Sequence, residues 1–319
     1  DQATGARFVR NPDWWGGKTP LDSVEWTFFQ DLQPQVVAVQ SGQADAIVQF
    51  SVLGGEGLLS AENIKVVRLQ SAAHKQIWMR VDQGQFTDKR VRQALAYSLD
   101  REAMVQSLFK GNADIGNDHP IAPVFPFSDD NPPQRERDVE MAKQLLADAG
   151  ASGISATFHV VKLQEAPDLG VLIRNNAADV GIDLKVAVED TTTFYGKSWC
   201  PPKPKDPPCS GADEIGIVDY GHRGVPDVYL NASLSTGGAW NSAQYSNPEY
   251  DQAFKDYRAA VGVDEQRTAA DRIEEILLED SSTLFPYFFN FLSAHSDQFA
   301  NIGVTAIGHM FLGNAGRVA

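Results

Sequence analysis

Apolar residues between Phe86 and Gly111 recur at the spacing of a helix that is buried along one face. The stripe runs i, i+3, i+4, i+7, i+8 through Val91, Ala94, Leu95, Ser98 and Leu99. Asp88 or Thr87 is suited to cap the start, and Asp100 is suited to end this helix and cap the next. Gly111 suits the left-handed position after a helix. The pattern therefore predicts two consecutive helices, and their basic residues Lys89, Arg90, Arg92 and Arg101 are expected to form a solvated edge.

Elsewhere the hydrophobic pattern alternates between strand-like and helix-like segments. Strands are expected at 24–29, 44–50, 64–70, 74–82, 154–162, 183–190, 214–220, 283–296 and 304–308. Further helices are expected after residue 32 and at 136–150, 169–182, 247–261 and 263–281. The order strand, helix, strand over 154–190 predicts a βαβ unit, and with it a partly parallel sheet.

These segments form two blocks, and the end of the chain is expected to rejoin the beginning. We therefore predict two lobes that are joined by more than one crossover, which makes a hinge. Residues 1–79 with 287–319 are assigned to lobe one, and residues 80–286 to lobe two. The crossovers are expected near 76–82 and 285–290.

Composition limits the possible partners. The chain has 319 residues, of which 43% are hydrophobic, so it can bury large cores. Its formal net charge of −15 argues against a nucleic-acid partner. No apolar run approaches the length that crosses a membrane.

Two cysteines, Cys200 and Cys209, enclose the segment "PPKPKDPP", which reads as an exposed, stiff loop. This placement favours a disulfide and an oxidising compartment. Two free thiols and a metal pair are the alternatives. The spacing is too long for a C-x-x-C metal knuckle, and no histidine lies close in sequence.

The sequence offers little chemistry for catalysis. It contains no nucleophile elbow, zinc-protease motif, P-loop or dinucleotide fingerprint. Its six histidines are scattered without ligand spacing: His74, His119, His159, His222, His295 and His309. Glu274 and Glu275 are adjacent on a helix, point apart, and are expected on a solvated face. We therefore expect neither a cofactor nor a metal, and a secreted hydrolase is disfavoured.

Five motifs occur in an order that resembles a known family. They are "RNPDWWGGKTPLDSVEW", "VVAVQSGQADAIV", "FTDKRVRQALAYSLDREAMVQSLFKG", "MAKQLLADAG" and "QYSNPEYDQAF". The order is similar to that of the family 5 extracellular solute-binding proteins, which serve oligopeptide and dipeptide ABC importers. The resemblance implies an α/β, two-lobed periplasmic-binding-protein type II fold with mixed sheets. Because such proteins begin well before the Asn11-Pro-Asp motif, we expect the N-terminal part of lobe one and an extra domain to be missing here.

The resemblance also implies a role. It suggests a monomeric bacterial receptor outside the cytoplasm, periplasmic or lipid-anchored at the cell surface, with an ABC permease as partner. Peptides are the expected ligands. An oligosaccharide, a nickel chelate or an opine is the alternative on the same scaffold.

Two strand ends are candidate ligand contacts, because ligands of open α/β folds bind beyond the carboxyl ends of strands. One end presents Gln49, Phe50 and Ser51. The other presents Asp219, Tyr220, His222 and Arg223.

In peptide-binding relatives, an aspartate in the loop that matches the second strand end holds the peptide's α-ammonium. Asp219 is the candidate here. The family's aspartate-proline pair reads Val225-Pro226 in this chain, which leaves Asp227 as the other choice, and a purely structural aspartate as the further alternative. Trp240 and Tyr245 are candidate aromatic contacts, with packing under the loop as the alternative.

Overall fold

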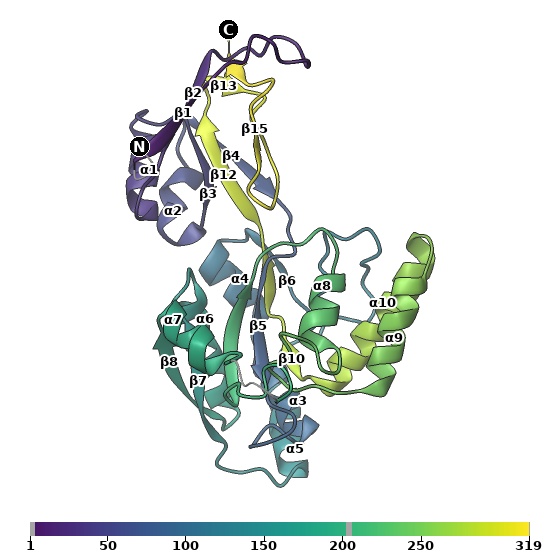
Figure 1. Ribbon diagram of the computed structural model, residues 1–319. Helices are drawn as coiled ribbons and strands as arrows, with labels where there is room; N and C mark the ends of the chain where they lie inside the picture. The colour runs from purple at the N-terminus through teal and green to yellow at the C-terminus, as the bar shows by residue number, and fades with distance from the viewer. Residues whose placement is uncertain (1–3, 202–205, 319) are drawn as a thin grey trace. The chain divides into compact units, whose positions relative to one another are not determined.

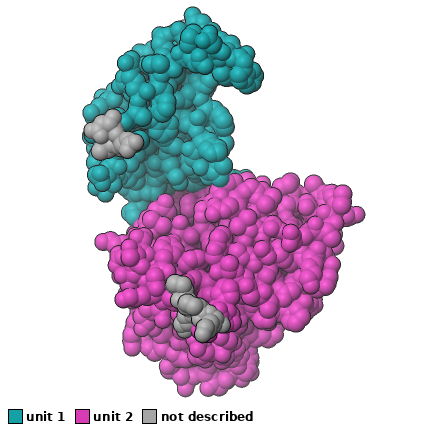
Figure 2. Space-filling model, viewed as in Figure 1, with its two compact units in different colours: residues 1–70, 290–319 teal, residues 71–289 magenta. Residues whose placement is uncertain are grey.

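The chain forms a mixed α/β structure that divides into two compact units. The computed structural model describes residues 4–201 and 206–318 (Figure 1). Unit 1 comprises residues 1–70 and 290–319, and unit 2 comprises residues 71–289 (Figure 2). The sequence analysis predicted the lobe boundaries between residues 79 and 80 and between residues 286 and 287. The whole of β5 (His74–Met79) hydrogen-bonds within the sheet of unit 2, which explains why residues 71–79 group there.

Unit 1 is built on a three-stranded antiparallel sheet of order β3-β12-β4. Its strands are β3 (Ala46–Phe50), β4 (Ile64–Leu69) and β12 (Phe291–Ser296). The helices α1 (Leu32–Gln40) and α2 (Val52–Leu59) accompany them. A separate two-stranded ribbon pairs β1 (Gly5–Val9) with β2 (Ser23–Thr27). The remaining short strands are β13 (Phe299–Ala300), β14 (Gly303–Val304), β15 (Met310–Phe311) and β16 (Gly316–Arg317).

Unit 2 contains a seven-stranded sheet of order β6-β11-β5-β9-β7-β8, with β10 also paired to β5. Its further strands are β6 (Ala113–Ile115), β7 (Ser155–Val161), β8 (Asp183–Glu189), β9 (Ile215–Tyr220), β10 (Thr283–Leu284) and β11 (Tyr287–Phe289). β7 is parallel to both β8 and β9, so the predicted βαβ unit is confirmed. The other pairs are antiparallel. The β7–β9 pairing brings the carboxyl ends of two strands to the same edge of the sheet.

Unit 2 also contains longer helices. They are α3 (Lys89–Ser98), α4 (Arg101–Phe109), α5 (Val139–Asp148), α6 (Ala166–Asp179), α9 (Pro248–Ala259) and α10 (Val263–Asp280). Short helical turns occur at α7 (Thr191–Thr193), η1 (Phe194–Ser198), α8 (Asp227–Tyr229) and η2 (Leu230–Leu234). No helix of the described residues has both the length and the apolar character needed to span a membrane.

The predicted helix pair is confirmed as α3 and α4. Asp88 accepts a hydrogen bond from the Arg90 amide, and Asp100 accepts one from the Ala103 amide, so both side chains cap helices. The apolar stripe of the first helix is buried. Gly111 has a positive φ of 78°, as its place after the helix requires.

The expectation of a solvated basic edge on this pair is wrong for two of its four residues. Arg92 and Arg101 are both buried. Arg92 donates to the carbonyl of Asp280, the last residue of α10. The last carbonyls of a helix lack partners within it, so a buried guanidinium is well suited to satisfy them.

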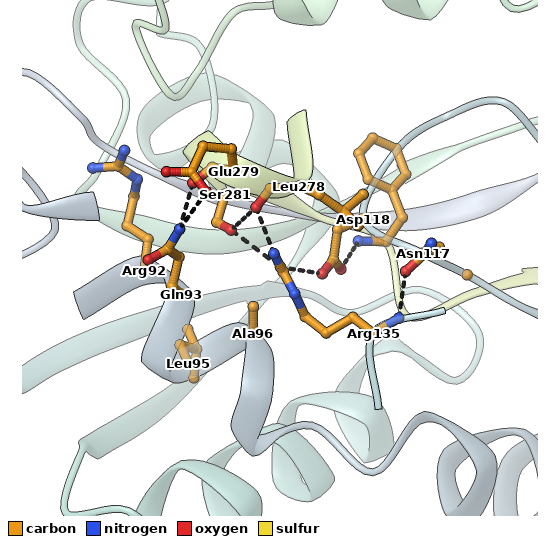
Figure 3. Close-up of polar contacts among 12 residues, drawn as sticks. Arg92, Gln93, Leu95, Ala96, Asn117, Asp118, Arg135, Leu278, Glu279 and Ser281 are labelled. Carbon is orange, nitrogen blue, oxygen red and sulfur yellow. Dashed lines mark hydrogen bonds and ion pairs between the residues drawn. The ribbon is translucent and has the colours of Figure 1, made fainter. Parts of the chain in front are cut away.

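Asp118 connects Arg101, at the start of α4, with Arg135, which in turn contacts the end of α10. Its carboxylate is fully buried and accepts hydrogen bonds from Arg101 at 2.8 and 2.7 Å and from Arg135 at 2.8 Å. Arg135 also donates to the Ser281 hydroxyl at 3.1 Å and contacts the Leu278 carbonyl (Figure 3). We call Asp118, Arg101 and Arg135 the buried arginine network. The network links parts of unit 2 that are far apart in the sequence.

Glu274 contradicts the expectation of a solvated position. It lies buried on α10, and its Oε2 is 3.5 Å from Nε2 of buried His119. Burial, assisted by the charges of Asp271 and Asp129, raises the Glu274 pKa to about 9. Burial lowers the pKa of His119 to about 4. At neutral pH both side chains are therefore uncharged. Glu275, the next residue, is exposed as predicted and pairs with Arg272.

The C-terminal strand predictions need correction. The sequence predicted a strand over 283–296 that leads back to the first sheet. Instead β10 and β11 pair within unit 2, and only β12 pairs within unit 1. Proline at 286 has no amide proton for a sheet, which fits the break between β10 and β11. The expected strand at 304–308 is limited to its first residue, Val304 in β14.

Candidate functional site

The candidate site lies in unit 2, where β7 and β9 end. Asp219 is the penultimate residue of β9, and Glu165 follows β7 in the loop before α6. β5 runs antiparallel to β9, and its second residue, Lys75, is the register partner of Asp219. We call Lys75, Gln164, Glu165 and Asp219 the strand-end cluster.

The Lys75 ammonium is surrounded by hydrogen-bond acceptors from β9 and from the loop after β7. It forms an ion pair with the Asp219 Oδ1, lies 3.2 Å from the Glu165 Oε1, and donates to the Gln164 Oε1 at 3.1 Å. The ammonium is also 4.7 Å from the centre of the Phe289 ring, within cation–π range. Lys75 has no exposed side-chain area, which a lysine accepts only when its charge is paired.

The two carboxylates differ in how far they are open to solvent. Glu165 is 4% exposed, and its Oε1 also accepts a hydrogen bond from the Tyr287 hydroxyl at 2.9 Å. Asp219 is 21% exposed. With Lys75 at +1 and two carboxylates at −1 each, the cluster carries a formal net charge of −1. Asp219 is thus the group through which this charge reaches solvent.

Aromatic side chains adjoin the cluster. Tyr220, next to Asp219, is buried, and its ring stacks on Trp240 with the centroids 5.7 Å apart. Trp199 packs edge-on against the same Tyr220 ring at 6.3 Å, and Tyr195 packs edge-on against Trp199. Tyr195, Trp199 and Trp240 are each partly exposed, so they can offer ring surface to a ligand. Burial, together with the nearby Asp219 charge, raises the pKa of the Tyr195 hydroxyl.

His222 and Arg223 follow β9, as the sequence predicted, and both form hydrogen bonds within the protein. The His222 Nδ1 accepts a hydrogen bond from the Ala72 amide at 2.9 Å, so this nitrogen carries no proton. Burial and the neighbouring Arg223 charge lower the His222 pKa. Arg223 is exposed and donates to the carbonyls of Gly221 and His222. Of these two side chains, Arg223 is the one whose charge is open to solvent.

The other predicted strand end belongs to unit 1. Gln49 is exposed and Ser51 is half-buried, with its hydroxyl donating to the Leu53 carbonyl at 2.7 Å. Phe50 was expected to contact ligand, but it is 3% exposed and its ring packs against Gly55, in the core of unit 1. The strand alternation explains this: Phe50 points to the face opposite Gln49.

The remaining candidates are held by other contacts. Asp227 pairs with Arg258 at 3.2 Å, at the base of α8. Tyr245 is buried, and its hydroxyl donates to the Asp280 carboxylate at 2.5 Å. Tyr245 therefore packs under the loop, which was the alternative reading of this residue.

The predicted disulfide is confirmed. Cys200 and Cys209 are bonded, across the loop that follows η1. The segment 202–205 between them lies outside the described residues. Among the residues that the structure does describe, no group of three or more histidine, cysteine, aspartate or glutamate side chains is arranged to hold a metal ion.

Sequence reasoning missed Lys75, Gln164, Glu165, Tyr195 and Trp199. One signal was present: Lys75 interrupts the otherwise buried strand "HKQIWM" with a charge. A lysine in a fully buried strand needs a carboxylate nearby, and Asp219 was the candidate carboxylate. Nothing in the sequence pairs the two strands, so the contact itself was beyond prediction.

Comparisons with known proteins agree with this fold. The family model described as bacterial extracellular solute-binding proteins, family 5 Middle, matches residues 1–202. Heme-binding protein A of Haemophilus influenzae is 23% identical over 97% of this chain and 55% of its own length. Oligopeptide-binding protein AppA of Bacillus subtilis is 24% identical over 88% of this chain and 53% of its own length. The chain therefore spans about half the length of these curated relatives.

Solved structures show the same fold. HbpA2 from Haemophilus parasuis superposes with a TM-score of 0.81 at 17% identity, over 99% of this chain and 62% of that one. AppA from Bacillus subtilis, in complex with a nonapeptide, superposes with a TM-score of 0.74 at 21% identity, over 98% and 64%.

Proposed function

We propose that this chain, which belongs to the bacterial extracellular solute-binding proteins of family 5, is part of a receptor that captures peptides outside the cytoplasm for an ABC importer. The observation that carries the proposal is the strand-end cluster. It presents one partly exposed carboxylate, Asp219, beside partly exposed aromatic rings. The AppA structure with a nonapeptide supports peptides as the ligand class. The disulfide supports an oxidising compartment.

In this proposal Asp219 binds the ligand's α-ammonium. Its Oδ1 is paired with Lys75, and its side chain retains exposed area for a second partner. Tyr195, Trp199 and Trp240 supply ring surface for side chains of the peptide. Arg223 has an exposed charge and lies in the loop that follows β9, where it can bind an anionic group of the ligand. This arrangement binds and orients a ligand, and it assigns no covalent chemistry to the site.

The first experiment identifies the ligand. Full-length protein is purified without added ligand and denatured, and the released small molecules are analysed by mass spectrometry. Peptides are the expected result. A nickel chelate, an opine or an oligosaccharide would overturn the peptide assignment.

The second experiment tests the anchor. Calorimetry compares an identified peptide with its N-acetylated form, on the wild type and on Asp219→Asn. A fully buried ammonium–carboxylate pair is worth about 2–5 kcal/mol. Because Asp219 is partly exposed and shared with Lys75, we expect about 1–2 kcal/mol, or about a 5- to 30-fold loss of affinity.

Acetylation and Asp219→Asn should each cause this loss, and together they should cause little more. Asp227→Asn is the matched control, because it removes a carboxylate at the base of α8. If Asp227→Asn instead reduces affinity and Asp219→Asn does not, the anchor is misassigned.

A further inference from the structure

The contacts of Lys75 resemble those expected for a bound ammonium. A carboxylate oxygen of Asp219, a carboxylate oxygen of Glu165, the amide oxygen of Gln164 and the Phe289 ring surround one nitrogen. These contacts come from the end of β9, the loop after β7, and β11. The protein thus places its own cation against the carboxylate that the proposed function assigns to the ligand.

We infer that Lys75 is a specificity-determining residue that competes with the ligand's amine for Asp219 and so keeps amine selectivity low. This inference rests on the proposed function and names what sets the range of peptides that the receptor accepts. Ligands with a blocked or missing amine are then tolerated, because Asp219 is never left without a cation.

The charge of the cluster gives the direction of the effect. In the wild type the formal net charge is −1. Replacing Lys75 by Met removes the competing cation and leaves Asp219 free to pair with the ligand alone. Replacing Glu165 by Gln has the opposite effect, because Lys75 then has Asp219 as its one remaining carboxylate. The two variants should therefore shift amine selectivity in opposite directions, which a purely structural role does not predict.

The experiment is a competition on full-length protein. An equimolar mixture of a random tripeptide library and its N-acetylated counterpart is offered to each variant. The retained peptides are quantified by mass spectrometry, and the ratio of free to acetylated peptides is the readout. The variants are Lys75→Met, Glu165→Gln, Asp219→Asn and the double variant Lys75→Met/Asp219→Asn.

The expected ratio is about tenfold higher in Lys75→Met than in the wild type, and several-fold lower in Glu165→Gln. Both variants that carry Asp219→Asn should give a ratio near one. Arg80→Met is the matched control: it removes a buried cation just beyond the other end of β5, where Arg80 pairs with Asp82. Its ratio should equal that of the wild type.

The outcomes separate the two ideas. An unchanged or lower ratio in Lys75→Met, with a wild type that retains peptides, overturns the role of Lys75 and leaves the receptor function standing. If Lys75→Met does not fold, Glu165→Gln decides, and an unchanged ratio there overturns the inference. If no variant retains any peptide, the proposed function falls, and the inference falls with it.

Discussion

Glu274 offers a sharp test of how burial controls charge in this fold. An ordinary glutamate loses its proton near pH 4.5, whereas Glu274 retains it up to about pH 9 because it is buried. The folded state therefore binds one more proton than the unfolded chain between these values. Stability from this group is fully present below about pH 4.5 and is lost as the pH rises towards 9. Glu274→Gln, a neutral replacement of similar shape, removes that loss.

The size of the gain follows from linkage. Each pH unit between the two pKa values is worth about 1.36 kcal/mol. At pH 8.5 this sets an upper limit of about 5 kcal/mol for the stabilisation by Glu274→Gln, and at pH 6.5 an upper limit of about 3 kcal/mol. Local opening that lets water reach an ionised Glu274 would reduce both values. We therefore expect the gain to grow by at least about 1 kcal/mol between pH 6.5 and pH 8.5.

Urea unfolding at these two pH values measures the effect. The lower pH lies at the upper end of the region in which His74 and His119 affect stability, and the higher pH lies above that region. Burial lowers the pKa of each to about 4, so their contribution to stability is lost as the pH falls from about 6.5 towards 4. Glu275→Gln is the control, because Glu275 is the exposed neighbour on the same helix, and it should change stability by less than about 1 kcal/mol at either pH. A Glu274→Gln gain that does not grow with pH would refute the reasoning.

Two further predictions concern the scaffold of unit 2. Asp118→Asn leaves Arg101 and Arg135 buried without their carboxylate, so it should lower the free energy of unfolding, measured in urea, by about 3–5 kcal/mol. Arg267→Gln breaks ion pairs on a largely solvated helix face and should lower it by less than about 1 kcal/mol. Equal losses in the two variants would contradict the assignment of the network. Thiol titration of the denatured, unreduced protein should find no free thiol. Reducing the Cys200–Cys209 bond should lower the free energy of unfolding by at most about 3 kcal/mol, because the closed loop is short. Two free thiols would contradict the disulfide, and a larger loss would contradict the short-loop argument.

The regular elements of this fold could be predicted because their signals are local. The caps Asp88 and Asp100 and the glycine at 111 mark helix ends within a few residues of the pattern they bound. The errors arose where tertiary packing decides the outcome. Arg92 lies off the apolar stripe, yet it is buried because the end of α10 needs donors for its carbonyls. Glu274 is buried on α10, although the next residue of the same helix, Glu275, is exposed to solvent.

The candidate site shows the same division between local and long-range information. The strand end at Asp219 was predictable, since an apolar strand followed by polar residues is visible in one short segment. The charge that this strand end presents was not predictable, because it depends on Lys75, which lies 144 residues away in the sequence and meets Asp219 through strand register. A family motif can thus indicate the residue that we propose as the anchor without giving the charge of its surroundings. For this chain the difference is between a free carboxylate and one that already holds a cation, and peptides with free and with blocked amines distinguish the two.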